Sequence, residues 1–245
     1  MMNRYALLSM MILVAAGGGL TQTAHAGSPF LTDMVIPALT EQLRDWDASV
    51  RQAAVFALRE MGPEAKSAIP ALAELLRDTD RCVAIDASHT LENMGAEVAP
   101  SLVPLLRDEN PRVRTLALRT LQQIGPEAKA AIPAIAERLR DCDASVRQAA
   151  VYALREMGPE AKPAIPALAE LLRDTDRYVA IDASHTLEKM GAEAVPSLVS
   201  LLRDENPRVR KLAAQTLQQI ASEAGPGAPK DLRPGATAVL PTVHF

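Results

Sequence analysis

Aromatic residues are scarce in this 245-residue chain, of which Phe, Tyr and Trp make up 3%. Apolar residues nevertheless amount to 48%, so the core has to be built from Ala, Leu, Ile and Val. This composition suits closely packed helices, because strands favour aromatic and β-branched side chains. We therefore expect an all-α protein.

Cysteine and an excess of positive charge are lacking as well. Two cysteines are too few for a disulfide-stabilised scaffold. The 26 Lys and Arg residues are outnumbered by 30 Asp and Glu residues, which gives a net charge of −4 at pH 7. Since binding to phosphates requires a surplus of basic residues on some face, we expect no nucleic-acid partner.

The first 26 residues have the layout of a cleaved secretory signal. Arg4 precedes an apolar run over residues 5–16, and the small-x-small tripeptide of residues 24–26 follows. The run is too short to span a bilayer, and three successive glycines at 17–19 would break an ordinary buried helix. We predict cleavage after Ala26, export to the periplasm or beyond, and no stable membrane insertion after cleavage.

The rest of the chain is an internal repeat. Residues 36–131 match residues 132–227 at 77 of 96 positions, and each copy holds three related units that begin 33 and then 30 residues apart. Beyond Ala224 the sequence is rich in Gly and Pro and has no helical period. The predicted organisation is therefore a signal peptide (1–26), a linker (27–35), six repeats (36–227) and a flexible tail (228–245).

Each unit is predicted to form two helices. The first opens at a proline, as at Pro70, and carries Leu72, Leu75 and Leu76 at helical spacing. A polar turn leads to a second helix, which ends at a glycine such as Gly62. No unit shows the alternation typical of a strand. The residues expected to cap the second helices are Asp47, Asp80, Asn110, Asp143, Asp176 and Asn206.

The pattern from Leu43 to Ala65, Leu-Arg-Asp-x-Asp-x-x-Val-Arg-x-x-Ala-x-x-Ala-Leu-x-x-Met-Gly-Pro-Glu-Ala, resembles the HEAT repeat, in the short form first recognised in phycobilin lyase subunits. The resemblance implies an α-α superhelix, a HEAT-like solenoid of six two-helix repeats whose second helices line a concave face. It also implies a scaffold that binds a protein or peptide, since few such proteins are enzymes.

Three columns of side chains on the second helices point away from the buried stripe and form the candidate binding surface. Phe56 and Tyr152 are predicted as aromatic anchors about 30 Å apart, at roughly 10 Å per helical layer. The alternative is a solvated face on which Arg59 pairs with Glu92, and the equivalent residues pair in the second copy. The candidate residues are Phe56, His89, Arg119, Tyr152, His185, Gln52, Arg59, Glu92, Gln148, Arg155 and Glu188.

We expect no cofactor, no metal and no enzymatic activity. His89 with Glu92, and His185 with Glu188, stand three residues apart on a helix and could each offer two ligands, but the pairs are predicted to lie about 30 Å apart. The His-Glu dipeptides of deoxyhypusine hydroxylases are absent. The alternatives are a HEAT-like enzyme or enzyme subunit of the phycobilin lyase or deoxyhypusine hydroxylase kind, and a structural envelope protein.

We make structural predictions for two further pairs of residues. Asp86 and Asp182 stand near the edge of the predicted core, either as a buried acidic site or, as we favour, hydrogen-bonded near the start of their helices. Cys82 and Cys142 are predicted to lie roughly 20 Å apart, too far for a disulfide, whose Cα atoms lie within about 7 Å. Bridging between chains stays open.

Overall fold

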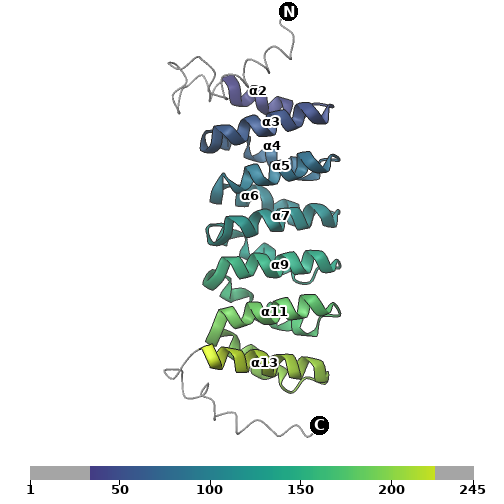
Figure 1. Ribbon diagram of the computed structural model, residues 1–245, viewed down its shortest axis with the longest axis vertical. Helices are drawn as coiled ribbons and strands as arrows, with labels where there is room; N and C mark the ends of the chain where they lie inside the picture. Colours follow the sequence, from purple (N-terminus) through teal and green to yellow (C-terminus); the bar gives the residue numbers. More distant parts are fainter. Residues whose placement is uncertain (1–33, 224–245) are drawn as a thin grey trace, which may run out of the picture. The chain divides into compact units, whose positions relative to one another are not determined.

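The computed structural model describes residues 34–223, which form two compact units divided between Ala131 and Ile132. The predicted signal peptide and C-terminal tail lie outside the described residues. Within the described range the chain is helical and contains no strand (Figure 1). The all-α prediction is confirmed.

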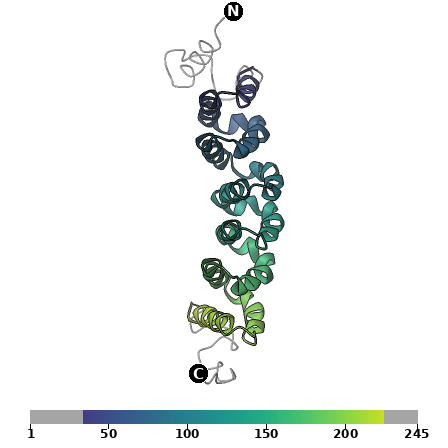
Figure 2. The same cartoon turned by 90° about the vertical axis from the view of Figure 1, so that its right-hand side faces the viewer.

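The first unit consists of three helix pairs in two layers. The second helices of the pairs pack side by side, α3 on α5 and α5 on α7, while α2, α4 and α6 lie behind them (Figures 1 and 2). Its elements are α2 (Ile36–Gln42), α3 (Ala48–Met61), η2 (Gly62–Ala68), α4 (Ile69–Glu74), η3 (Leu75–Arg77), α5 (Arg81–Glu92), η4 (Gly95–Val98), α6 (Ala99–Leu102), η5 (Val103–Arg107), α7 (Pro111–Ile124) and η6 (Gly125–Ala131).

The second unit repeats this arrangement. Here α9 packs on α11 and α11 on α13, while α8, α10 and α12 form the other layer. Its elements are α8 (Ile132–Arg138), α9 (Ala144–Met157), η7 (Gly158–Ala164), α10 (Ile165–Glu170), η8 (Leu171–Arg173), α11 (Arg177–Met190), η9 (Gly191–Ala194), α12 (Val195–Leu201) and α13 (Pro207–Glu223).

The second helices begin where the sequence predicts. All six predicted capping side chains accept a hydrogen bond from a backbone amide two residues further on. Asp80, for example, accepts from the amides of Cys82 at 2.8 Å and Val83 at 3.2 Å. Each cap satisfies amides that the first turn of a helix leaves without a partner, which fixes the start of the helix.

The connections after the second helices are more regular than the sequence suggests. Gly62 ends α3 with φ at +58°, a left-handed conformation that favours glycine. The connection from Gly62 to Ala68 forms the 3-10 helix η2. The last turn of the first helix is also tightened, since Leu75 and Leu76 lie in η3 rather than in α4, although both are buried as predicted.

The core is aliphatic, as the composition requires. In the first unit Leu72, Leu91 and Leu102 are fully buried, and Ala54 and Ala87 allow the second helices to approach closely. The layers therefore need few aromatic rings to fill the space between them.

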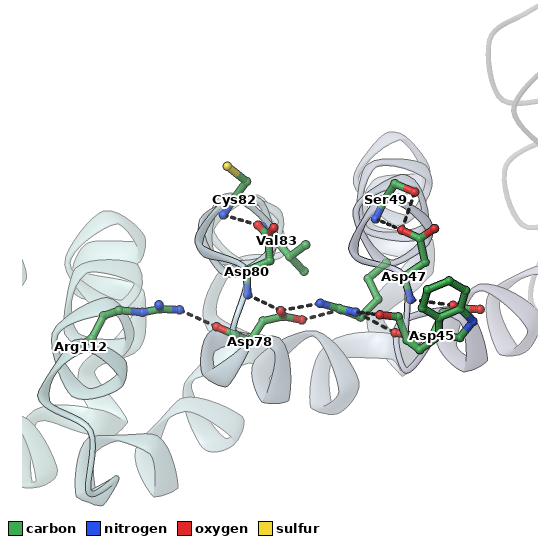
Figure 3. A network of polar contacts seen from close by, with 10 residues as sticks. Asp45, Asp47, Ser49, Asp78, Asp80, Cys82, Val83 and Arg112 are labelled. Carbon is green, nitrogen blue, oxygen red and sulfur yellow. Dashed lines mark hydrogen bonds and ion pairs between the residues drawn. The ribbon is translucent and has the colours of Figure 1, made fainter.

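A network of charged groups joins neighbouring repeats of the first unit at the turns before α3 and α5 (Figure 3). Arg51 donates through Nε and Nη2 to the two carboxylate oxygens of Asp78 in the next repeat, at 2.7 Å each. Its Nη1 donates to the carbonyl oxygens of Asp45 and Trp46 at 2.8 and 3.1 Å. The two side chains are largely buried, at 12% and 5% exposed. One guanidinium thus fixes its own turn and holds the next repeat.

Asp78 is ionised in this network. Burial acts to raise the pKa of Asp78, but the hydrogen bonds from Arg51 and the Asp80 amide, with the charges of Arg51 and Arg112, bring it below its ordinary value. The carbonyl oxygen of Asp78 also accepts from Arg112 of the third repeat at 2.6 Å. Arg147 and Asp174 form the equivalent two-bond pair in the second unit, at 2.7 and 2.8 Å.

Replacing Asp78 with Asn is expected to lower the free energy of unfolding at neutral pH by about 2 to 4 kcal/mol, because Arg51 loses its ionised partner in a largely buried place. Since the folded pKa of Asp78 lies below the unfolded one, its stabilisation is complete above about pH 4 and is lost as the pH falls. Urea unfolding at a series of pH values should show wild type and variant converging in acid.

Glu109→Gln is the matched control, because it removes an exposed carboxylate from the turn before α7. We expect this variant to follow the wild type at every pH. A stability difference between Asp78→Asn and the wild type that stayed constant into acid would contradict the role given to the ionised carboxylate.

Candidate functional site

The predicted columns of the first copy lie together on the solvent-exposed side of α3, α5 and α7, which we call the first-unit face. Phe56 is 54% exposed there, and Gln52, His89 and Arg119 are exposed as well. Arg59 and Glu92 belong to the same columns and are half-buried. The face combines one aromatic ring with amide, cationic and acidic groups.

Phe56 is covered on one side by the arginine one turn further along α3. The guanidinium carbon of Arg59 lies 4.4 Å from the centre of the Phe56 ring, within the range of a cation–π contact. The nearest carboxylate to Arg59 is that of Glu60, at 3.7 Å. The alternative in which Arg59 pairs with Glu92 is therefore wrong, because the aromatic ring and its own helix engage the guanidinium.

The side chains of α3 and α5 are joined at the centre of the first-unit face. Gln52 donates through Nε2 to the Oδ2 atom of Asp86 at 2.6 Å. Asp86 is half-buried, so it forms no enclosed acidic site. Asp86 is hydrogen-bonded, as we favoured, and the donor comes from the preceding second helix.

The second copy presents the same columns on α9, α11 and α13, which we call the second-unit face. Arg155 lies 4.7 Å from the centre of the Tyr152 ring and 3.2 Å from Glu156, so the alternative in which Arg155 pairs with Glu188 is wrong for the same reason. His185 is exposed beside half-buried Glu188.

Tyr152 differs from Phe56, its counterpart in the first copy, because it carries a hydroxyl group that is hydrogen-bonded. The hydroxyl donates to Oδ2 of Asp182 at 2.8 Å. Gln148 donates to the same oxygen at 2.7 Å. Burial, followed by the hydrogen bond and charge of Asp182, raises the pKa of Tyr152. Tyr152 is half-buried, and its hydroxyl is directed at Asp182.

Hydroxyl groups lie between the acid of each face and the core, a contact that the sequence did not predict. In the first unit the Ser88 hydroxyl oxygen lies 3.2 Å from the Glu92 carboxylate and 2.8 Å from the hydroxyl oxygen of Thr120 on α7. The Thr120 hydroxyl oxygen lies 3.0 Å from the carbonyl oxygen of Leu116. Burial raises the pKa of Glu92, although His89 and Ser88 act against it.

The same arrangement recurs in the second unit. Ser184 donates to Glu188 at 3.5 Å and lies 2.7 Å from the hydroxyl oxygen of Thr216. Burial raises the pKa of Glu188 as well. The sequence signal for this contact is a hydroxyl residue inside the apolar stripe of each helix. The first repeat of each copy has valine at the serine position and alanine at the threonine position.

Two aromatic side chains outside the columns are more exposed than Phe56. Trp46, in the turn before α3, is 88% exposed, and Tyr178, in the first turn of α11, is 73% exposed. Cys142 and Cys82 hold the equivalent positions in the other copy and are also exposed. All four residues lie next to a capping residue or within two positions of it. This place in the sequence could have predicted their exposure, because side chains beside an N-cap commonly point to solvent.

The described residues hold no group of three or more His, Cys, Asp or Glu side chains arranged to bind a metal ion. Between Met34 and Glu223 there is also no helix with the length and apolar character needed to cross a membrane. The two His–Glu pairs therefore stand as pairs, each on a single helix.

Paired helices repeated along the chain define a helical repeat protein. The family model of HEAT repeats matches residues 36–103, 83–155, 99–188 and 165–238. These matches cover most of the sequence, so the chain belongs to the HEAT-repeat family, as the motif indicated.

Solved structures with similar folds include Kap121p, at 15% identity and a TM-score of 0.57, over 90% of this chain and 28% of that one. An archaeal HEAT-like repeats protein from Thermococcus onnurineus NA1 is 18% identical, with a TM-score of 0.47 and coverage of 87% and 96%. The CpcE and CpcF complex of phycocyanin lyase from Nostoc sp. PCC7120 is 22% identical, with a TM-score of 0.47 and coverage of 61% and 98%. Curated proteins gave no match. These similarities concern the fold alone.

Replacing Glu92 with Gln is expected to stabilise the protein relative to the wild type as the pH rises above about 4. Since the folded pKa of Glu92 lies above the unfolded one, its favourable contribution is present at low pH and is lost as the pH rises through the folded pKa. The free energy of unfolding, measured for both proteins across this range, checks the prediction. Glu60→Gln, an exposed acid on α3, is the control, and parallel curves for Glu92→Gln and wild type would contradict it.

Proposed function

We propose that this protein is a non-catalytic scaffold that binds a protein or peptide through its two second-helix faces. The observation that carries the proposal is the stacked pair of Phe56 and Arg59, a largely exposed ring held in place from its own helix. An anchor that is already ordered loses little conformational entropy when a partner binds. Trp46 is more exposed, but it lies in a turn and outside the face.

The surroundings of the anchor support binding of an extended segment. His89 on α5 and Arg119 on α7 are both exposed, so polar groups follow the ring across three packed helices. The second-unit face offers Tyr152 and His185 at the positions of Phe56 and His89, and Arg155 over the tyrosine ring. The approximate distance of 30 Å between the two anchors and the concavity of the surface stay predictions. A partner that contacted both faces would gain affinity, because its second contact would be intramolecular.

Alanine at the anchors tests the proposal. Peptides selected from a random display library against residues 27–245 would supply ligands, and calorimetry would give their affinities. Phe56→Ala and Tyr152→Ala should each weaken binding by about 1 to 3 kcal/mol, the usual effect of truncating an interface aromatic. The double variant should bind more weakly than either.

Trp46→Ala is the matched control, since it removes an exposed aromatic side chain of the first unit from a turn outside the face. Helicity measured by circular dichroism confirms that each variant is folded. Unchanged affinities for the Phe56 and Tyr152 variants, or a loss confined to Trp46→Ala, would refute binding through the faces.

We further propose that the protein is exported before it acts, on the basis of the sequence of residues 1–26. Expression of the whole chain in a bacterial host should yield a product that begins at Gly27 in the periplasm, and mass spectrometry of the purified protein measures this directly. Ala26→Arg should block the cleavage. An uncleaved product retained in the cytoplasm would overturn the proposal.

A further inference from the structure

Equivalent carboxylates on the two faces differ in the number of donors that reach them. Asp182 accepts from Gln148 at 2.7 Å and from the Tyr152 hydroxyl at 2.8 Å. Asp86 accepts from Gln52 at 2.6 Å, and its aromatic neighbour Phe56 has no hydroxyl to donate. The first unit therefore has a carboxylate with one donor fewer.

The groups around the carboxylate and the aromatic ring have nearly the same spacing in both units. The glutamine-to-aspartate distance differs by 0.1 Å between the units, at 2.6 and 2.7 Å. The arginine lies over the ring at 4.4 Å in one unit and 4.7 Å in the other. Phe56 holds the position that Tyr152 holds in the second unit, where the tyrosine hydroxyl reaches Asp182. The corresponding place in the first unit has an apolar ring and a carboxylate but no hydroxyl donor.

We propose that this position binds the ammonium group of a lysine side chain from an extended peptide partner, with the lysine methylenes against the exposed ring of Phe56. The inference rests on the proposed function of the face and names the partner chemistry. An ammonium that donates to Asp86 forms a hydrogen bond in which donor and acceptor are both charged, whereas the tyrosine hydroxyl supplies a neutral donor.

The carboxylate of Asp86 favours a cationic partner. The guanidinium of Arg59 on α3 is already engaged with the Phe56 ring and Glu60. A lysine suits the place better than an arginine. Its ammonium is a compact donor on an apolar stem, which can replace one hydroxyl group, whereas a guanidinium is a planar fork that needs two acceptors in line.

The test uses N-acetyl-lysine methylamide as the probe and nuclear magnetic resonance as the readout, on the chain of residues 27–245. We expect saturable shifts of the Gln52 side-chain amide and of the Phe56 ring in the wild type, without comparable shifts at Gln148 and Tyr152. Asp86→Asn should weaken binding about tenfold, the loss expected for one charge-assisted hydrogen bond. N-acetyl-norleucine methylamide, which lacks the ammonium, should produce no saturable shift at these groups.

The exchange of the two aromatic residues makes the decisive comparison. Phe56→Tyr should abolish the first site by supplying the missing hydroxyl, and Tyr152→Phe should create a second site at Asp182. Both changes add or remove one oxygen, so folding is preserved and circular dichroism verifies it. Absence of saturable shifts, or equal binding by wild type and Phe56→Tyr, would overturn the inference.

The result is separable from the test of the proposed function. If selected peptides bind the face and the lysine probe does not, the scaffold function stands and the lysine site is wrong. If the probe binds at Asp86 and no peptide depends on Phe56 or Tyr152, the site stands and the scaffold function is wrong.

Discussion

The ion pair between Arg51 and Asp78 holds neighbouring repeats in register, and the surfaces of the first unit depend on it. The guanidinium engages both carboxylate oxygens of the next repeat and two carbonyl oxygens of its own turn. Because both side chains are largely buried, the pair tolerates little displacement of one repeat against the next. The equivalent pair of Arg147 and Asp174 does the same within the second unit.

Register is what brings the polar groups of successive second helices together. With the turns fixed, Gln52 reaches Asp86 and the Ser88 hydroxyl reaches Thr120. Exposed pairs such as Lys66 with Glu97, at 2.6 Å, add little stability, since solvent screens them. The buried and half-buried contacts therefore determine which side chains of the faces lie side by side.

The two units show how a duplicated surface acquires different chemistry through few substitutions. Phe56 and Tyr152 differ by one oxygen atom, yet the tyrosine is half-buried and bonded to Asp182, while the phenylalanine is largely exposed beside Asp86. Arg59 and Arg155 cover both rings. A scaffold with two such faces can present one open acidic position and one that its own tyrosine fills.

The sequence by itself determined the helices, their caps and the family, because these depend on local spacing: a proline or capping residue such as Asp80 at each start, a glycine such as Gly62 at the end, and an apolar stripe between them. It also identified the columns that face outward. Only the tertiary structure decided the partners that Asp86 and Ser88 have on other helices. Gln52 and Thr120 lie on neighbouring second helices, and their distances follow from how the repeats pack rather than from spacing along the chain.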